Sequence, residues 1–142
     1  MKPSEFLDAA RRYSQGNHEA DWRSAISRAY YGVFHYFSEL FASHGLKLGA
    51  SGQAHFNLYA GLLHCGFAPV GPIASRIDDL RRRRVTADYN LSALVDQATA
   101  AALVQEAHLI IADFQTILQT TPAAQIVAGA RKHLQMIGKI VP

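Results

Sequence analysis

The sequence predicts an all-α fold, an up-down bundle of five or six helices in one domain that covers residues 1–142. Apolar residues recur every three or four positions along several segments, which places them on one face of a helix. No segment alternates apolar and polar residues for long, as a half-buried strand would. Short stretches rich in Gly and Pro separate the periodic segments, and a chain of 142 residues is long enough to bury one core.

A first helix is expected over residues 4–15, with Ser4 as its N-cap and Gly16 at its end. The next periodic segment, residues 21–44, contains no Pro and only one Gly, so it predicts one long amphipathic helix. Its apolar face carries Trp22, Ile26, Tyr30, Val33, Phe37, Leu40 and Phe41, and its polar face carries Asp21, Ser24, Arg28, His35 and Glu39.

A third helix is expected over residues 53–65, with Ser51 before it as a cap. A short fourth helix begins near residue 73 and reaches the segment RRRRVTADYN. Val85 and Thr86 in this segment are β-branched and weaken a helix, so an irregular elbow is expected there.

Residues 92–121 form the fifth predicted helix, and their apolar side chains lie around much of its circumference, as in a helix packed on several sides. Pro122 suits the first position of a last helix, residues 122–138. The core of the predicted domain therefore covers about residues 4–120, and the last helix packs either on this core or on a second subunit.

The composition argues against several classes of protein. The single cysteine, Cys65, cannot form an intrachain disulfide. No apolar run approaches the roughly 20 residues needed to span a bilayer, and the first residues lack the apolar segment of a signal peptide. The histidines offer no pair at a zinc-site spacing with a second pair to complete four ligands. We therefore expect a cytoplasmic protein without a metal or another cofactor.

The basic residues are unevenly distributed along the chain. The formal net charge is only +3, yet four of the 14 basic residues are consecutive, Arg81 to Arg84. Such a run concentrates positive potential, which favours contact with phosphate. The alternative interpretation is a solvated helix end, whose cations interact favourably with the helix dipole.

Two blocks of the sequence carry a resemblance to a known family. The first runs from Arg28 to His35 (RAYYGVFH), and the second runs from Leu80 to Tyr89 (LRRRRVTADY). In this order they resemble the HEPN domain family, above all its stand-alone bacterial and archaeal members, over about residues 4–120. The resemblance implies that an Arg-x6-His motif on a long helix forms the active site of a metal-independent ribonuclease.

The resemblance also implies partners. A homodimer is expected, in which a second copy of the long helix completes the site, and a nucleotidyltransferase antitoxin is a possible partner, since several such proteins are encoded beside one. The best described toxins of the family continue the motif as His-x-Tyr, with a tyrosine that the nucleotidyltransferase modifies. Phe37 stands at that position here and has no hydroxyl group, so this mode of control is not expected.

The motif residues have the chemistry that metal-free RNA cleavage needs. An imidazole exchanges protons near neutral pH, so His35 can act as the base for the 2′-hydroxyl or as the acid for the leaving 5′-oxygen. Arg28 can stabilise the charge that builds on the phosphorane. The two residues lie two turns apart, with Cα atoms roughly 10.5 Å apart along the axis, which suggests a site completed by a second subunit. Tyr31, Glu39, Arg81 and Arg84 are the candidate substrate-binding residues.

Two alternatives remain open. The same polar face could bind a nucleotide or a partner protein such as a nucleotidyltransferase without catalysis. It could also be a solvated helix face, with Asp21 paired to Arg28 and Glu39 hydrogen-bonded to His35 at i, i+4 spacing.

Overall fold

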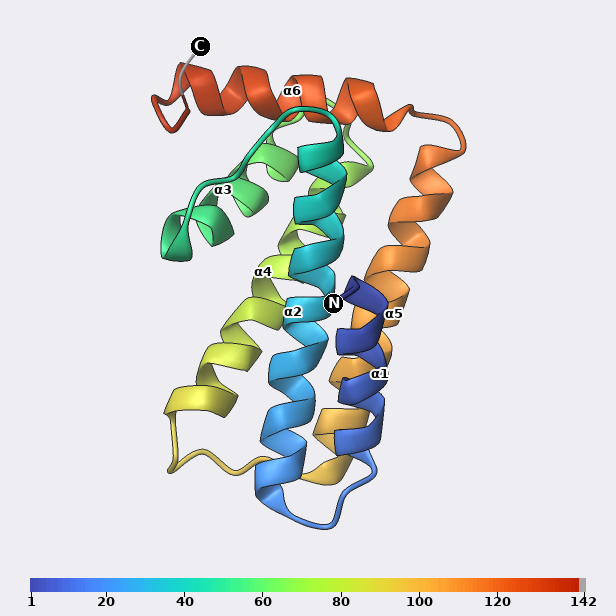
Figure 1. The fold of residues 1–142 in the computed structure, drawn as a ribbon, viewed down its shortest axis with the longest axis vertical. Helices are drawn as coiled ribbons and strands as arrows, with labels where there is room; N and C mark the ends of the chain where they lie inside the picture. Colours follow the sequence, from blue (N-terminus) through green and yellow to red (C-terminus); the bar gives the residue numbers. More distant parts are fainter. Residues whose placement is uncertain (141–142) are drawn as a thin grey trace. The chain divides into compact units, whose positions relative to one another are not determined.

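The computed structural model describes residues 1–140, except for the side chain of Ser51. Within this range it contains six α-helices and no strand, so the prediction of an all-α fold is confirmed. The third helix begins at Ser51 with Ala50 as its N-cap, so the prediction of Ser51 as the cap is wrong. No helix within residues 1–140 has the length and apolar character that a membrane span requires. In chain order the helices are α1 (Pro3–Ser14), α2 (Glu19–Ser43), α3 (Ser51–Leu63), α4 (Val70–Tyr89), α5 (Gln97–Leu118) and α6 (Ala123–Met136) (Figure 1).

The start of α1 differs from the prediction. Lys2 is the N-cap, and Pro3 occupies the first turn, so Ser4 is not the cap. Pro3 favours this arrangement because its fixed φ suits the first helical position, where no hydrogen-bond donor is needed. Similarly, Pro122 is the N-cap of α6 instead of its first residue.

The expected elbow in α4 is wrong, because the helix continues unbroken to Tyr89. Leu80 and Ala87 are both buried, so packing holds this part of the helix in place. Ion pairs at i, i+4 spacing add to this, including one at 3.4 Å between Arg84 and Asp88. Tertiary packing therefore outweighs the weak helix propensity of the β-branched pair.

Helix α5 begins at Gln97, five residues after the predicted start at residue 92. Two side chains shape the preceding segment. The Asn90 side-chain oxygen accepts hydrogen bonds from the backbone N–H and the hydroxyl group of Ser92, at 3.2 and 2.8 Å. The Asp96 carboxylate accepts a 2.8 Å bond from the Thr99 N–H, and hydrogen bonds from Thr99 hold the Asp96 pKa below its usual value. These turns compete with helix formation before residue 97.

The chain divides into two compact units, and whether they make up one domain, as expected, stays a prediction. The first unit combines Met1–His35 with Ile77–Ile111, so it contains α1 and parts of α2, α4 and α5. Its core includes Ile26, Tyr30 and Val33, which confirms the predicted apolar face of α2 in this unit. Burial raises the pKa of the Tyr30 hydroxyl.

The second unit contains Tyr36–Arg76 and the chain from Ala112 onward. Phe37 is fully buried, and its ring centroid lies 4.7 Å from that of Phe114. Helix α6 packs closely on α3 and the residues after it, because a Cβ atom built on Gly129 would lie 1.8 Å from the Cys65 carbonyl oxygen. Only glycine permits this approach.

Candidate functional site

Arg28 and His35 lie on the same side of α2, and one aromatic ring of α1 contacts both. The ring centroids of Phe6 and His35 are 4.8 Å apart, and the guanidinium carbon of Arg28 lies 5.9 Å from the Phe6 centroid. Gly32 allows α1 to approach this closely, since a Cβ atom there would lie 2.7 Å from a methyl carbon of Leu7. No sequence pattern predicted the part that Phe6 plays.

The two candidate catalytic residues have different surroundings. His35 is half-buried, and besides Phe6 it lies beside the rings of Phe34 and Tyr31, at centroid distances of 5.4 and 6.1 Å. Arg28 is exposed, and the ion pairs of residues 1–140 do not include it, so the pair with Asp21 that one alternative allowed is not formed. The guanidinium is therefore available to an anion.

Arg84 lies inside the first unit, against the tyrosines of α2. Its side chain is 9% exposed, and its guanidinium carbon lies 5.4 Å from the Tyr30 ring and 5.2 Å from the Tyr31 ring. The Asp88 carboxylate accepts a 3.4 Å bond from Arg84 and a 3.2 Å bond from the Ser27 hydroxyl group. The Nε atom of Arg84 is buried and has no hydrogen-bond partner in this structure. Arg84 thus supports Tyr31 from within the unit, and Tyr31 in turn contacts His35.

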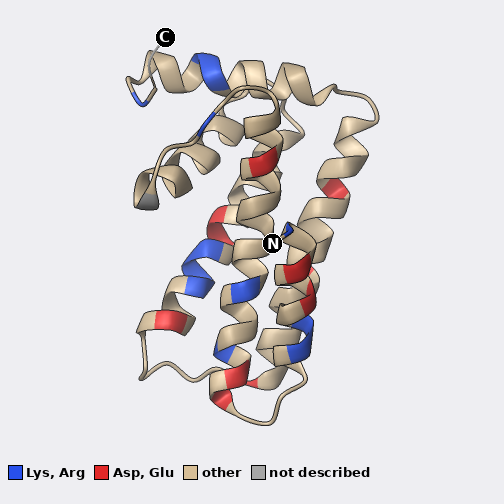
Figure 2. Ribbon diagram, in the orientation of Figure 1, with Lys and Arg blue, Asp and Glu red and all other residues tan. Residues whose placement is uncertain are grey.

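The other arginines of the run pair with carboxylates one turn earlier in α4. Asp78 accepts from Arg81 at 3.3 Å and from Arg82 at 2.8 Å, while Arg83 lies 4.0 Å from Asp79. Figure 2 shows acidic residues close to the basic ones along α4. The positive potential of the run is therefore smaller than the arginines alone predict, and these residues lie within the helix, not at its end.

Glu39 is exposed and belongs to the second unit, whereas the other predicted site residues belong to the first. Within residues 1–140, no group of three or more histidine, cysteine, aspartate or glutamate side chains is arranged to hold a metal ion.

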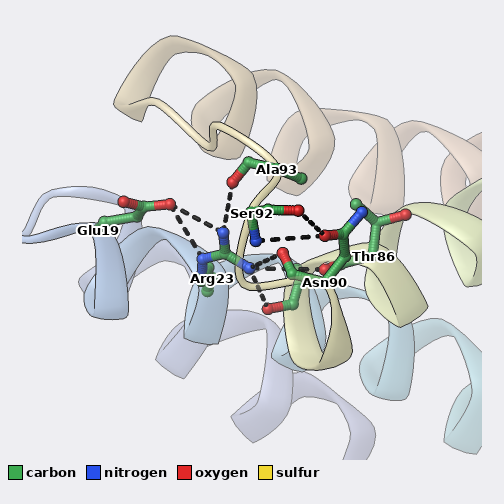
Figure 3. A network of polar contacts seen from close by, with 7 residues as sticks. Glu19, Arg23, Thr86, Asn90, Ser92 and Ala93 are labelled. Atoms are coloured by element: carbon green, nitrogen blue, oxygen red, sulfur yellow. Dashed lines mark hydrogen bonds and ion pairs between the residues drawn. The ribbon is translucent and has the colours of Figure 1, made fainter.

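Arg23 has a structural role that the sequence did not predict. Its guanidinium donates hydrogen bonds to the backbone carbonyl groups of Ala87 and Asn90, both at 2.9 Å, and to that of Ala93 (Figure 3). It also pairs with Glu19 at 2.9 Å. The i, i+4 spacing of Glu19 and Arg23 is visible in the sequence. The contacts with these three carbonyl groups, and a longer one of 3.5 Å with that of Thr86, depend on the tertiary fold. They fix the end of α4 and the segment that follows it.

Comparison of the chain with protein-family models, with curated proteins and with solved structures found no match. The resemblance to the HEPN family therefore rests on the two sequence blocks and stays a prediction.

Proposed function

We propose that this protein is a metal-independent endoribonuclease of the HEPN type, with Arg28 and His35 as its catalytic residues. One observation carries the proposal: a half-buried imidazole and an exposed guanidinium without an ion-pair partner in the described chain lie on one face of α2, against the same Phe6 ring. This arrangement offers a proton-transfer group and a free cation to one substrate.

In the proposed reaction the 2′-oxygen of the RNA attacks the adjacent phosphorus, and the bond to the 5′-oxygen breaks. His35 removes the proton from the 2′-hydroxyl group or donates one to the leaving oxygen. Arg28 stabilises the additional negative charge on the phosphorane. The products are a 2′,3′-cyclic phosphate and a free 5′-hydroxyl group.

A homodimer would complete this chemistry. One imidazole cannot serve as base and acid on opposite sides of the phosphorus in the same step. A two-fold dimer with facing α2 helices would bring a second Arg28–His35 pair to the cleft.

Cleavage of a labelled single-stranded RNA in EDTA tests the proposal. We expect His35→Ala to lower the rate by a factor of roughly 100 or more, the usual contribution of a general acid or base. His18→Ala is the matched control, because His18 is exposed and precedes α2. Equal background cleavage by the wild type and His35→Ala would end the catalytic interpretation.

Mixing the wild type with an equal amount of His35→Ala tests the shared cleft. If the cleft needs both imidazoles, dimers with one variant subunit are inactive, so random exchange of subunits should lower the activity to about half of that of the unmixed wild type. Sedimentation that shows only monomer at high concentration, or activity unchanged after exchange, would contradict the shared cleft.

The second candidate is a module that binds a nucleotide or a nucleotidyltransferase without cleaving RNA. The aromatic rings around His35 favour it, because such rings bind bases or apolar partner side chains equally well. Stable co-purification with a nucleotidyltransferase, combined with no RNA cleavage under any condition, would support this candidate over the ribonuclease.

A further inference from the structure

A surface hollow lies beside Arg28. The residues of α2 that line it, Asp21 and Arg28, precede His35 in the sequence. It has a volume of about 610 Å³ and lies between α1 and the start of α2. Its polar lining comes from two guanidinium groups, one phenol and one carboxylate, contributed by Arg12, Tyr13, Asp21 and Arg28. All four belong to the first unit. Neither the sequence pattern nor the proposed reaction accounts for this grouping.

The guanidinium groups of the hollow are available to a ligand. Arg12 and Tyr13 are exposed at the surface, with Tyr13 at 40%. No carboxylate of residues 1–140 forms an ion pair with Arg12 or Arg28. Two unpaired cations at one hollow strongly favour an anionic ligand, and guanidinium groups suit phosphate in particular.

The carboxylate of the hollow lies over the turn before α2. A Cβ atom on Gly16 would lie 2.4 Å from the Asp21 carboxylate, so this side chain lies directly over the glycine. The indole N–H of Trp22 donates a 2.9 Å hydrogen bond to the Gly16 carbonyl and fixes the same turn. Asp21 therefore presents a hydrogen-bond acceptor at the hollow, which suits a ribose hydroxyl group or an amino group of a base.

We propose that this hollow binds one nucleotide of a single-stranded RNA next to the phosphate held at Arg28 and His35. Arg12 and Arg28 contact its phosphates, Tyr13 stacks on its base, and Asp21 accepts a hydrogen bond from its sugar or base. The inference that the ligand is an RNA strand rests on the proposed function. Binding at the hollow does not depend on cleavage, because Arg12 and Tyr13 take no part in the reaction.

The length of the surface supports a strand as the ligand. From Asp21 to His35, α2 advances by roughly 21 Å, and Arg28 lies midway. Arg28 contacts Phe6, which contacts His35, and it also lines the hollow. The two proposed sites therefore share Arg28 and lie along one stretch of α2 that is longer than a single phosphate group.

Binding of a fluorescent, fully 2′-O-methylated oligonucleotide of about 12 nucleotides tests the proposal, because this probe has no 2′-hydroxyl group and cannot be cleaved. We expect Arg12→Ala to weaken binding several-fold and to reduce the slope of log Kd against log salt by about 0.7, the loss of one phosphate contact on a single strand. Tyr13→Ala should weaken binding roughly fivefold or more, and Tyr13→Phe should bind as the wild type does.

Arg11→Ala is the matched control. Arg11 is the neighbour of Arg12 and carries the same charge, but its guanidinium lies 3.5 Å from the His108 imidazole and does not line the hollow. Its replacement should leave the salt slope unchanged. Equal effects of Arg11→Ala and Arg12→Ala would overturn the hollow as a binding site and leave the proposed ribonuclease intact.

Experiments on the wild type can also separate the two proposals, because binding and cleavage are measured independently. Tight binding of the probe with no cleavage of natural RNA would refute the ribonuclease and retain the hollow. A titration with adenosine monophosphate distinguishes a free nucleotide from a strand. If the monophosphate binds through Arg12 while the oligonucleotide does not bind at all, a strand is the wrong ligand.

Discussion

Replacing Arg23 by alanine should destabilise the protein more than replacing an exposed arginine of the run in α4. The substitution leaves the backbone carbonyl groups of Ala87, Asn90 and Ala93 without their charged donor. Hydrogen bonds from a charged group contribute about 1.5–3 kcal/mol each where water is excluded. The bonds to Ala87 and Ala93 are partly buried, whereas the one to Asn90 is exposed and water replaces it at little cost.

The loss should therefore amount to about 3 kcal/mol in the free energy of unfolding, with the half-exposed Glu19 pair adding at most about 0.5 kcal/mol. With an unfolding entropy of about 2.1 cal/mol/K per residue, this corresponds to a fall in Tm of roughly 10 °C. Arg23→Lys should lose about half as much free energy of unfolding, because an ammonium group cannot reach all three carbonyl oxygens from one position.

Thermal unfolding followed by circular dichroism measures the effect, and amide hydrogen exchange of residues 86–95 locates it. Arg82→Ala is the control, because the Arg82 side chain is 65% exposed and its pair with Asp78 should contribute about 0.5 kcal/mol. The reasoning is refuted if Arg23→Ala and Arg82→Ala melt within about 2 °C of each other, or if exchange near Ala93 is as slow in Arg23→Ala as in the wild type.

Two further predictions concern the second unit. Gly129→Ala should cost about 1–3 kcal/mol or more in urea unfolding, because its Cβ atom would lie 1.8 Å from the Cys65 carbonyl oxygen, whereas Gly71→Ala, with open space at its Cβ position, should cost almost nothing. Equal unfolding midpoints would contradict the close approach of α6. Burial lowers the pKa of His133, and the charge of His64 lowers it further. The folded state therefore binds fewer protons than the unfolded state, and stability should fall as the pH drops below about 6.5. His133→Gln should reduce the loss of Tm between pH 7.5 and 5.5, and an unchanged loss would show that this histidine is not responsible.

The fold was predictable from the sequence wherever one helix face is apolar. In α2 the periodic residues Ile26, Tyr30 and Val33 are buried as expected, because burial of a continuous apolar stripe dominates the local energetics. The errors occur where short-range polar contacts or a proline determine the residue at which a helix begins. Asn90 and Asp96 form turns with their own backbone and delay α5, and Pro3 moves the start of α1. Such contacts involve single residues and leave no periodic signal.

The candidate site was predictable only in part. The spacing of Arg28 and His35 placed both on one face of α2, since this depends on helix geometry alone. The contacts of Phe6 depend on how closely α1 approaches, and that distance is set by the missing side chain of Gly32. The potential of the arginine run was not predictable for a different reason. Read as four cations it predicts a basic rim, but Asp78 lies one turn away on the same helix and pairs with two of them.

Arg28 belongs to both proposed sites, so its replacement cannot distinguish them. His35 and Arg12 can, because each lies in only one of the two. His35→Ala removes an interaction made during the chemical step, so kcat should fall while binding of the uncleavable strand is retained. Arg12→Ala removes a contact that is the same before and during the reaction, so KM should rise while kcat is retained. If both variants change kcat and KM in the same proportion, the two groups act as one site, and the division of α2 into a cleavage end and a binding end is wrong.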